Sequence, residues 1–221
     1  MSRHQPARAE NLRRAIAQEA ARIMAEHGIR DFYVAKRKAA ERYGVFEGGL
    51  LPKNIEIEEA LAGYQRLFGG ASHAESLLAQ RSAALEAMEW LAEFEPRLVG
   101  PVLAGTATAH VDVQLHLFAD RAESVALQLM DHGVPHEIGE RRVKLNAERF
   151  LACPTIRFEM AGVAIEAIVF PRDGIRQAPA SPLDGRPMRR ADLAEVAMLV
   201  EGGQRTESGE RRVAGGEQPE P

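Results

Sequence analysis

The first part of the chain carries apolar residues at helical spacing. Leu12, Ile16 and Ala20 recur every four positions, which predicts a helix over residues 9–27 with one apolar face. Glycine and proline residues interrupt the pattern after this helix and after each of the segments that follow. The predicted helices of this part cover residues 9–27, 32–43, 55–68 and 73–95. The chain is therefore expected to be entirely helical up to about residue 96.

From residue 97 onward, short apolar runs and alternating segments replace the helical spacing. In residues 111–118, VDVQLHLF, Val113 and Leu115 face one way, while Asp112 and Gln114 face the other, as along a half-buried strand. The predicted strands cover residues 98–104, 111–118, 136–144, 153–160 and 163–170, and the predicted helices cover 121–132 and 189–200. This order predicts a mixed sheet with helices packed on it, so the expected fold class is α+β.

The change of pattern also predicts how the chain is organised. We expect a helical N-terminal region over residues 1–72 and an α/β core that ends with a C-terminal helix over residues 73–200. Residues 201–221 contain almost no apolar side chains, and we predict that they are disordered.

Composition narrows the classes of protein that fit this fold. The chain has 221 residues with a single cysteine, Cys153, which excludes an intramolecular disulfide framework. No run reaches the ~18–20 apolar residues that a membrane span needs, and the first residues lack the apolar core of a secretory signal. We therefore expect a cytoplasmic protein without a membrane partner. The net charge of −4 argues against a surface that is coated by nucleic acid.

The segment 103–118, LAGTATAHVDVQLHLF, resembles the opening of the nucleotidyltransferase fold. In that fold a strand ends in Gly-Gly or Gly-Ser, the next strand carries two acidic residues one apart, and a later strand carries a third acid. The resemblance implies that Gly105 and Thr106 bind the phosphates of a nucleoside triphosphate. It implies that Asp112 and Glu166 are the catalytic residues and hold Mg²⁺. The acceptor substrate is not indicated.

The whole chain is also similar to a family of proteobacterial proteins described as nucleotidyltransferase-like. The phrases that carry this similarity are IRDFYVAKRKAAERYGV, FEPRLVGPVLAGTATAH, LHLFAD and DGRPMRRADLAEV. One residue departs from the fold's pattern: Gln114 stands where the second acid belongs, and a neutral amide is a poor ligand for Mg²⁺. The sequence therefore predicts that nucleotidyl transfer is weak or lost, while nucleotide binding is retained.

Structural roles for the same residues stay open. If Ala161-Gly162 is a two-residue hairpin loop, Arg157 lies opposite Glu166, and the two form a cross-strand ion pair with no catalytic role. Asp112 can equally be an ordinary polar residue of a half-exposed strand. His110 and His116 lie on the same side of the predicted strand as Asp112. They are roughly 20 Å apart along that strand, so we expect them to be separate surface histidines.

Two other classes of function compete with the nucleotidyltransferase hypothesis. Residues 15–45 resemble the start of a TetR-type repressor, and residues 1–50 hold ten Lys and Arg against six Asp and Glu. The segment FEGGLLPKN after Val45 breaks the pattern where a recognition helix would follow, so we expect no sequence-specific binding to nucleic acid. The remaining alternative is a structural or interaction protein whose N-terminal helices pack as a cap.

Overall fold

A computed structural model describes the chain except for residues 1–3, 30, 46–49, 110, 147 and 215–221. The chain divides into two compact units. Unit 1 consists of Met1–Gly70 and Pro182–Asp184, and unit 2 consists of Ala71–Ser181 and Gly185–Pro221. The first of these boundaries lies beside the expected one at residue 72. Each unit is described by itself below.

Unit 1 contains helices α1 (His4–His27), α2 (Phe32–Arg42) and α3 (Asn54–Phe68). Asp31 caps the N-terminus of α2, since its Oδ1 accepts hydrogen bonds from the backbone N–H groups of Tyr33 and Val34 at 2.7 and 3.0 Å. The apolar faces of the three helices meet in one core. Its buried side chains are Ile16, Ala17, Ala20, Ala21, Ile23, Met24, Ala35, Ala39, Ala40, Ile57 and Leu61.

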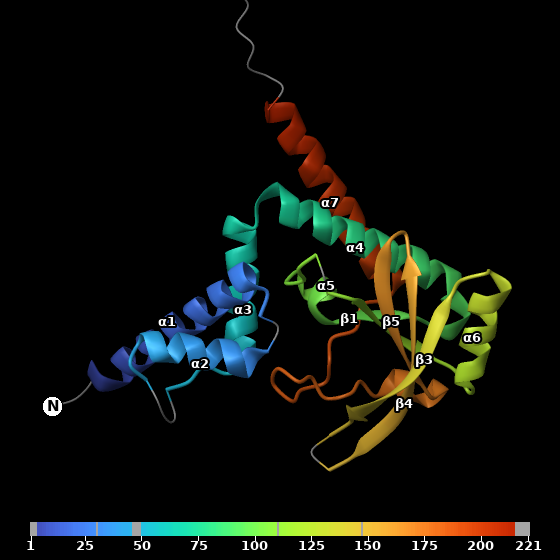
Figure 1. The fold of residues 1–221 in the computed structure, drawn as a ribbon, viewed down its shortest axis with the longest axis horizontal. Helices are drawn as coiled ribbons and strands as arrows, with labels where there is room; N and C mark the ends of the chain where they lie inside the picture. Colours follow the sequence, from blue (N-terminus) through green and yellow to red (C-terminus); the bar gives the residue numbers. More distant parts are fainter. Residues whose placement is uncertain (1–3, 30, 46–49, 110, 147, 215–221) are drawn as a thin grey trace, which may run out of the picture. The chain divides into compact units, whose positions relative to one another are not determined.

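Unit 2 combines helices with a mixed sheet (Figure 1). Its elements are α4 (Gly70–Trp90), η1 (Ala92–Phe94), β1 (Arg97–Val99), α5 (Gly100–Ala104), β2 (Val113–Phe118), α6 (Ala122–Asp131), β3 (His136–Lys144), β4 (Phe150–Met160), β5 (Val163–Phe170), η2 (Arg172–Arg176) and α7 (Leu193–Ala214). Within the described residues, the strand order is β1-β2-β5-β4-β3, and only β2 and β5 pair in parallel. The predicted α+β class is confirmed.

One face of the sheet packs on helices. Val113, Leu115 and Leu117 of β2 are fully buried there, together with the alternate residues of β4 and β5. The helices α4, α5, α6 and α7 supply the other side of this core through residues such as Met88 and Val125. We call this the core face, and its opposite the second face. The alternation that predicted the strands thus has its cause in a sheet that is covered by helices on one side.

The predicted register of the β4–β5 hairpin is confirmed. Met160 pairs with Val163, so Ala161-Gly162 is the two-residue loop, and Arg157 pairs with Glu166. Both loop residues have positive φ, 50° at Ala161 and 76° at Gly162. These signs are those of a type I′ turn, which matches the twist of the flanking strands.

The predicted strand over residues 98–104 is wrong in its second half. Strand β1 ends at Val99, and residues 100–104 form the short helix α5. Gly100 has a φ of +74° and Pro101 occupies the first turn of the helix. A residue in the left-handed region cannot continue a strand, and proline favours the start of a helix. The apolar run alone could not distinguish these two structures.

The expected disorder after residue 200 is also wrong for part of the tail. Helix α7 continues from Leu193 to Ala214, and residues 215–221 lie outside the described part. A Cβ added to Gly203 would lie 2.9 Å from Cδ1 of Leu78 in α4, so the two helices approach closely at this point. Packing against α4 therefore extends α7 beyond the end that the sparse apolar content predicted.

Candidate functional site

A cluster of polar side chains occupies one half of the second face of the sheet in unit 2. We call it the polar half, and its members are Asp112, Gln114, Arg141, Arg157 and Glu166. The strand register brings them together: Gln114 of β2 pairs with Glu166 of β5, and Glu166 pairs in turn with Arg157 of β4. Paired residues of neighbouring strands point to the same face. The sequence-predicted acids thus meet on one face rather than on opposite ones.

Each predicted acid is engaged by an arginine. Arg157 forms an ion pair with Asp112, which lies directly before β2, and Nη2 of Arg141 donates to Oε1 of Glu166 at 2.8 Å. Strand β4 lies between β3 and β5, so Arg141 reaches across it. The expected pair between Arg157 and Glu166 is therefore replaced by two other pairs. In these two pairs, Asp112 and Arg141 come from outside the β4–β5 hairpin that contains Arg157 and Glu166.

The charges of the polar half differ in exposure. The side chain of Glu166 is 11% exposed and that of Asp112 is 29% exposed, while those of Arg141 and Arg157 are 45% and 55% exposed. The hydrogen bond to Asp112 raises the pKa of Arg157, and the charges of Asp112 and Glu166 act in the same direction. Both carboxylates therefore act on one guanidinium, and the arginines cover them from the solvent side.

Gly100 lies against this cluster. A Cβ built at Gly100 would meet Oε1 of Gln114 at 2.6 Å, which is closer than side chains approach one another. The residue also has a φ of +74°. A glycine at the end of β1 thus lets the backbone approach the side chain of Gln114. Gly100, and not Gly105, is the glycine that directly follows strand β1.

The predicted turn, Gly105-Thr106, lies at the other end of α5. Gly105 ends that helix with a φ of +80°, and the atoms nearest to a Cβ built there belong to Arg81 and Leu77 of α4. Thr106 is buried, at 4% exposure, and its backbone N–H donates to the carbonyl of Pro101. Phosphate binding by Gly105 and Thr106 stays a prediction, and the close approach of backbone to the polar half is made by Gly100.

The contacts of the polar half are not those of a two-ion centre. Both carboxylates are taken up by guanidinium groups. In the described part of the chain, no three His, Cys, Asp or Glu side chains gather so that they could hold a metal ion. His110, which shares the parity of Asp112, lies outside the described residues. Mg²⁺ at Asp112 and Glu166 stays a prediction.

The other half of the second face is apolar and contains a buried histidine. Phe118, Phe170, Cys153 and Ile168 pack together there. His116 is 1% exposed, and burial together with the charge of Arg190 lowers its pKa to about 3. Nε of Arg190 donates to Nδ1 of this ring at 3.1 Å. The expectation of a surface histidine is therefore wrong, because the second face is covered at this end.

Two residues of the polar half could not be found by sequence reasoning. Arg141 is placed there by the register of the β3–β4 pair, in which Lys144 pairs with Phe150 around a longer connection. No residue in that connection predicts its register. Gly100 did carry a signal, since it follows two apolar residues and precedes Pro101, but the whole run resembled a strand.

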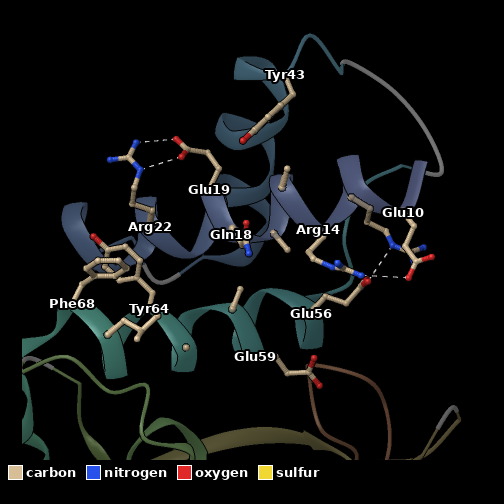
Figure 2. Close-up of a pocket in the computed structure, with 16 residues that line it drawn as sticks. Glu10, Arg14, Gln18, Glu19, Arg22, Tyr43, Glu56, Glu59, Tyr64 and Phe68 are labelled. Carbon is tan, nitrogen blue, oxygen red and sulfur yellow. Dashed lines mark hydrogen bonds and ion pairs between the residues drawn. The ribbon is translucent and has the colours of Figure 1, made fainter. Parts of the chain in front are cut away.

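Unit 1 contains a groove of about 790 Å³ between α1 and α3 (Figure 2). Figure 2 shows charged side chains from both helices around it, and many of these are paired with one another. The pairs are Arg13–Glu56, Arg14–Glu10 and Arg22–Glu19. None of the sequence-predicted site residues lines this groove, so it is a separate feature of the helical unit.

Two basic residues of α2, Lys36 and Arg37, form polar contacts within unit 1. Nζ of Lys36 donates to Oδ1 of Asn54 at 3.1 Å, and burial lowers the pKa of this lysine. Arg37 forms an ion pair with Glu41 at 3.6 Å. Helix α2 ends at Arg42 and α3 begins only at Asn54. These contacts add nothing in favour of the helix-turn-helix alternative.

No protein-family model matches the chain, and neither a curated protein nor a solved structure matches it significantly. The similarity to nucleotidyltransferase-like proteins therefore stays an expectation. None of the described helices combines the length and the apolar character that crossing a membrane requires.

Proposed function

We propose that the chain is a nucleotidyltransferase-like protein that binds a nucleoside triphosphate at the polar half of the sheet and transfers a nucleotidyl group weakly or not at all. One observation carries this proposal. Gln114 and Glu166 share one face of two parallel neighbouring strands, Asp112 lies directly before β2 and pairs with Arg157 on that face, and Gly100 packs against Gln114. A strand-end glycine beside a pair of acidic strands is the arrangement that the resemblance implies for a nucleotide site.

The arginines support the binding part of the proposal. Arg141 and Arg157 are about half exposed, and their ion pairs with Glu166 and Asp112 use one Nη atom of each. A guanidinium carries five N–H donors in a planar fork that matches the geometry of phosphate. The remaining donors can bind phosphate oxygens, which are the groups that all nucleoside triphosphates share.

The same contacts support weak or lost transfer. Nucleotidyl transfer requires that an acceptor hydroxyl be activated and that developing negative charge be stabilised. Gln114 has no charge and cannot accept a proton as a carboxylate does. Asp112 and Glu166 are held in ion pairs, so neither is available as an unpaired base. The site is thus better suited to holding a nucleotide than to activating an acceptor.

The proposal is tested by measuring both binding and transfer. The protein is incubated with α-labelled nucleoside triphosphates, Mg²⁺ or Mn²⁺, and a set of candidate acceptors. We expect nucleotide binding with little transfer of label. We also expect transfer to rise in Gln114→Asp but not in Gln177→Asp, which adds the same charge at an exposed position of unit 2.

Two results would contradict the proposal. Absence of nucleotide binding would contradict the whole proposal. Robust transfer by the unaltered protein that is lost in Asp112→Ala would show that the missing acid is supplied by another residue.

A further inference from the structure

The polar half contains its own counter-ions. Asp112 and Glu166 stand where the resemblance expects carboxylates that bind metal ions, yet each contacts an arginine from another strand. In a carboxylate site, divalent cations are needed because a triphosphate would otherwise be repelled by the acids that bind it. Arg157 and Arg141 carry out this neutralisation from within the chain.

We propose that the polar half binds the triphosphate of its ligand directly through Arg141 and Arg157, without a divalent cation. This inference rests on the proposed function and specifies how that site recognises its ligand. The class of ligand is a phosphoanhydride chain, and the base and sugar contribute less to affinity than the phosphates do.

The charges of the four residues support direct recognition. Asp112 and Glu166 contribute two negative charges, and the two arginines contribute two positive charges, so the cluster does not repel an anion. The carboxylates are the more buried members and the guanidinium groups the more exposed ones. A ligand that approaches from solvent therefore meets N–H donors before it meets carboxylate oxygens.

Gln114 fits the same interpretation. Its carboxamide replaces one negative charge with a group that can donate hydrogen bonds as well as accept them. It lies beside Glu166 in the parallel pair, and its Oε1 faces the backbone of Gly100. The replacement that weakens a metal site is thus one that favours an anion site.

Two exposed carboxylates near Arg157 oppose anion binding: Glu137 of β3, and Glu159, which lies two residues further along β4 on the same face. Glu137 of the edge strand β3 pairs with Arg157 and acts on it electrostatically. Both carboxylates are exposed to water, where charges are strongly screened. The buried Glu166 is the more important charge, and Arg141 already compensates it.

The experiment is a calorimetric titration of the full chain with ATP and with inorganic tripolyphosphate, each in EDTA and in excess Mg²⁺. We expect both probes to bind in EDTA, with dissociation constants within about threefold of one another. Arg157→Gln and Arg141→Gln should each weaken binding by about tenfold or more, since each removes charge-assisted hydrogen bonds. Arg157→Lys keeps the charge but loses the fork, and should weaken binding less than Arg157→Gln does.

The matched control is Arg172→Gln, because Arg172 forms an exposed ion pair with Asp120 at 3.3 Å in the same unit. This variant should bind both probes as the unaltered chain does. Equal weakening in Arg172→Gln would show that general charge attraction accounts for binding, and would overturn the inference.

The two proposals fail differently in this experiment. Binding of ATP that requires Mg²⁺ and disappears in EDTA would overturn the inference and leave the proposed function intact. Binding of ATP without binding of tripolyphosphate would overturn the claim that the polar half recognises its ligand through the phosphates. Absence of ATP binding under both conditions would overturn the proposed function itself.

Discussion

The core face and the polar half of the sheet in unit 2 are built from the same strands but differ in almost every physical respect. Leu115 of β2 points to the core face and is fully buried, whereas its neighbour Gln114 points to the polar half. On the core face, stability depends on apolar area removed from water. On the polar half, buried or half-buried charges are compensated in pairs, which contributes little to stability. A face whose contacts add little to folding is where a binding function is expected.

The largest expected difference between the faces is in stability. Leu115→Ala should lower the free energy of unfolding by about 2–5 kcal/mol, because it leaves a cavity in a packed core. Gln114→Ala should change it by only about 0.5 kcal/mol. Urea unfolding followed by the fluorescence of Trp90, the single tryptophan and a residue of unit 2, measures both. Similar losses in the two variants would contradict the division into faces.

The second prediction concerns pH and the apolar half. His116 has a folded-state pKa of about 3 against an ordinary value of 6.5, so the unfolded chain binds the proton more readily. Stability should therefore be complete above about pH 6.5 and fall as the pH is lowered from there toward 3. The slope reaches at most about 1.4 kcal/mol per pH unit.

His116→Gln isolates this contribution. The variant should show a flatter dependence of unfolding free energy on pH between about 6.5 and 5, where carboxylates contribute least. His132→Gln is the control, since this histidine is exposed. An unchanged slope in His116→Gln would mean that the ring is not buried in its neutral form.

The third prediction concerns the contact that joins β1 to the polar half. Gly100→Ala forces an alanine into the left-handed region and brings its Cβ to 2.6 Å from Oε1 of Gln114. A loss of about 1–3 kcal/mol is expected. In a Gln114→Ala background the steric part disappears and only the backbone strain remains. A double-mutant cycle on thermal unfolding measures the coupling, and a coupling near zero would contradict the close approach.

The smallest effect is expected at the hairpin that positions Glu166. Ala161 has a φ of 50° in the first position of the turn, where asparagine is preferred. Ala161→Asn should raise the free energy of unfolding by a few tenths of a kcal/mol. Ala164→Asn, in the adjoining strand, should not raise it. Stabilisation by both substitutions would point to an effect other than turn geometry.

Most of the fold could be predicted from the sequence, and the reasons are local. The helical spacing around Ile16 and the alternation around Leu115 report which side of each element is buried. The register of the β4–β5 hairpin followed from a two-residue loop at Ala161-Gly162. The start of α5 at Gly100 could not be predicted, because an apolar run of that length is compatible with a strand or a helix.

The site was less predictable because its charges come from elements far apart in the chain. Strand parity places Asp112 on the same side as Gln114, and the register adds Glu166 to that face. The arginine partners could not be predicted, since Arg141 reaches Glu166 across an intervening strand. The partner of a long side chain depends on the three-dimensional arrangement of the strands, and neither residue spacing nor strand parity predicts that arrangement. The proposal of an internally neutralised site in place of a metal site depends on these two partners.

The most direct test of the central claim observes the arginine side chains themselves. In a ¹⁵N-edited NMR titration with ATP, the Nε–H signals of Arg141 and Arg157 should shift progressively and saturate together. The signals of Arg172, in unit 2, and Arg22, in unit 1, should stay unchanged. Assignment follows from the single substitutions Arg141→Gln and Arg157→Gln. Saturating shifts confined to other arginines, with Arg141 and Arg157 unaffected, would contradict the claim that the polar half binds the nucleotide.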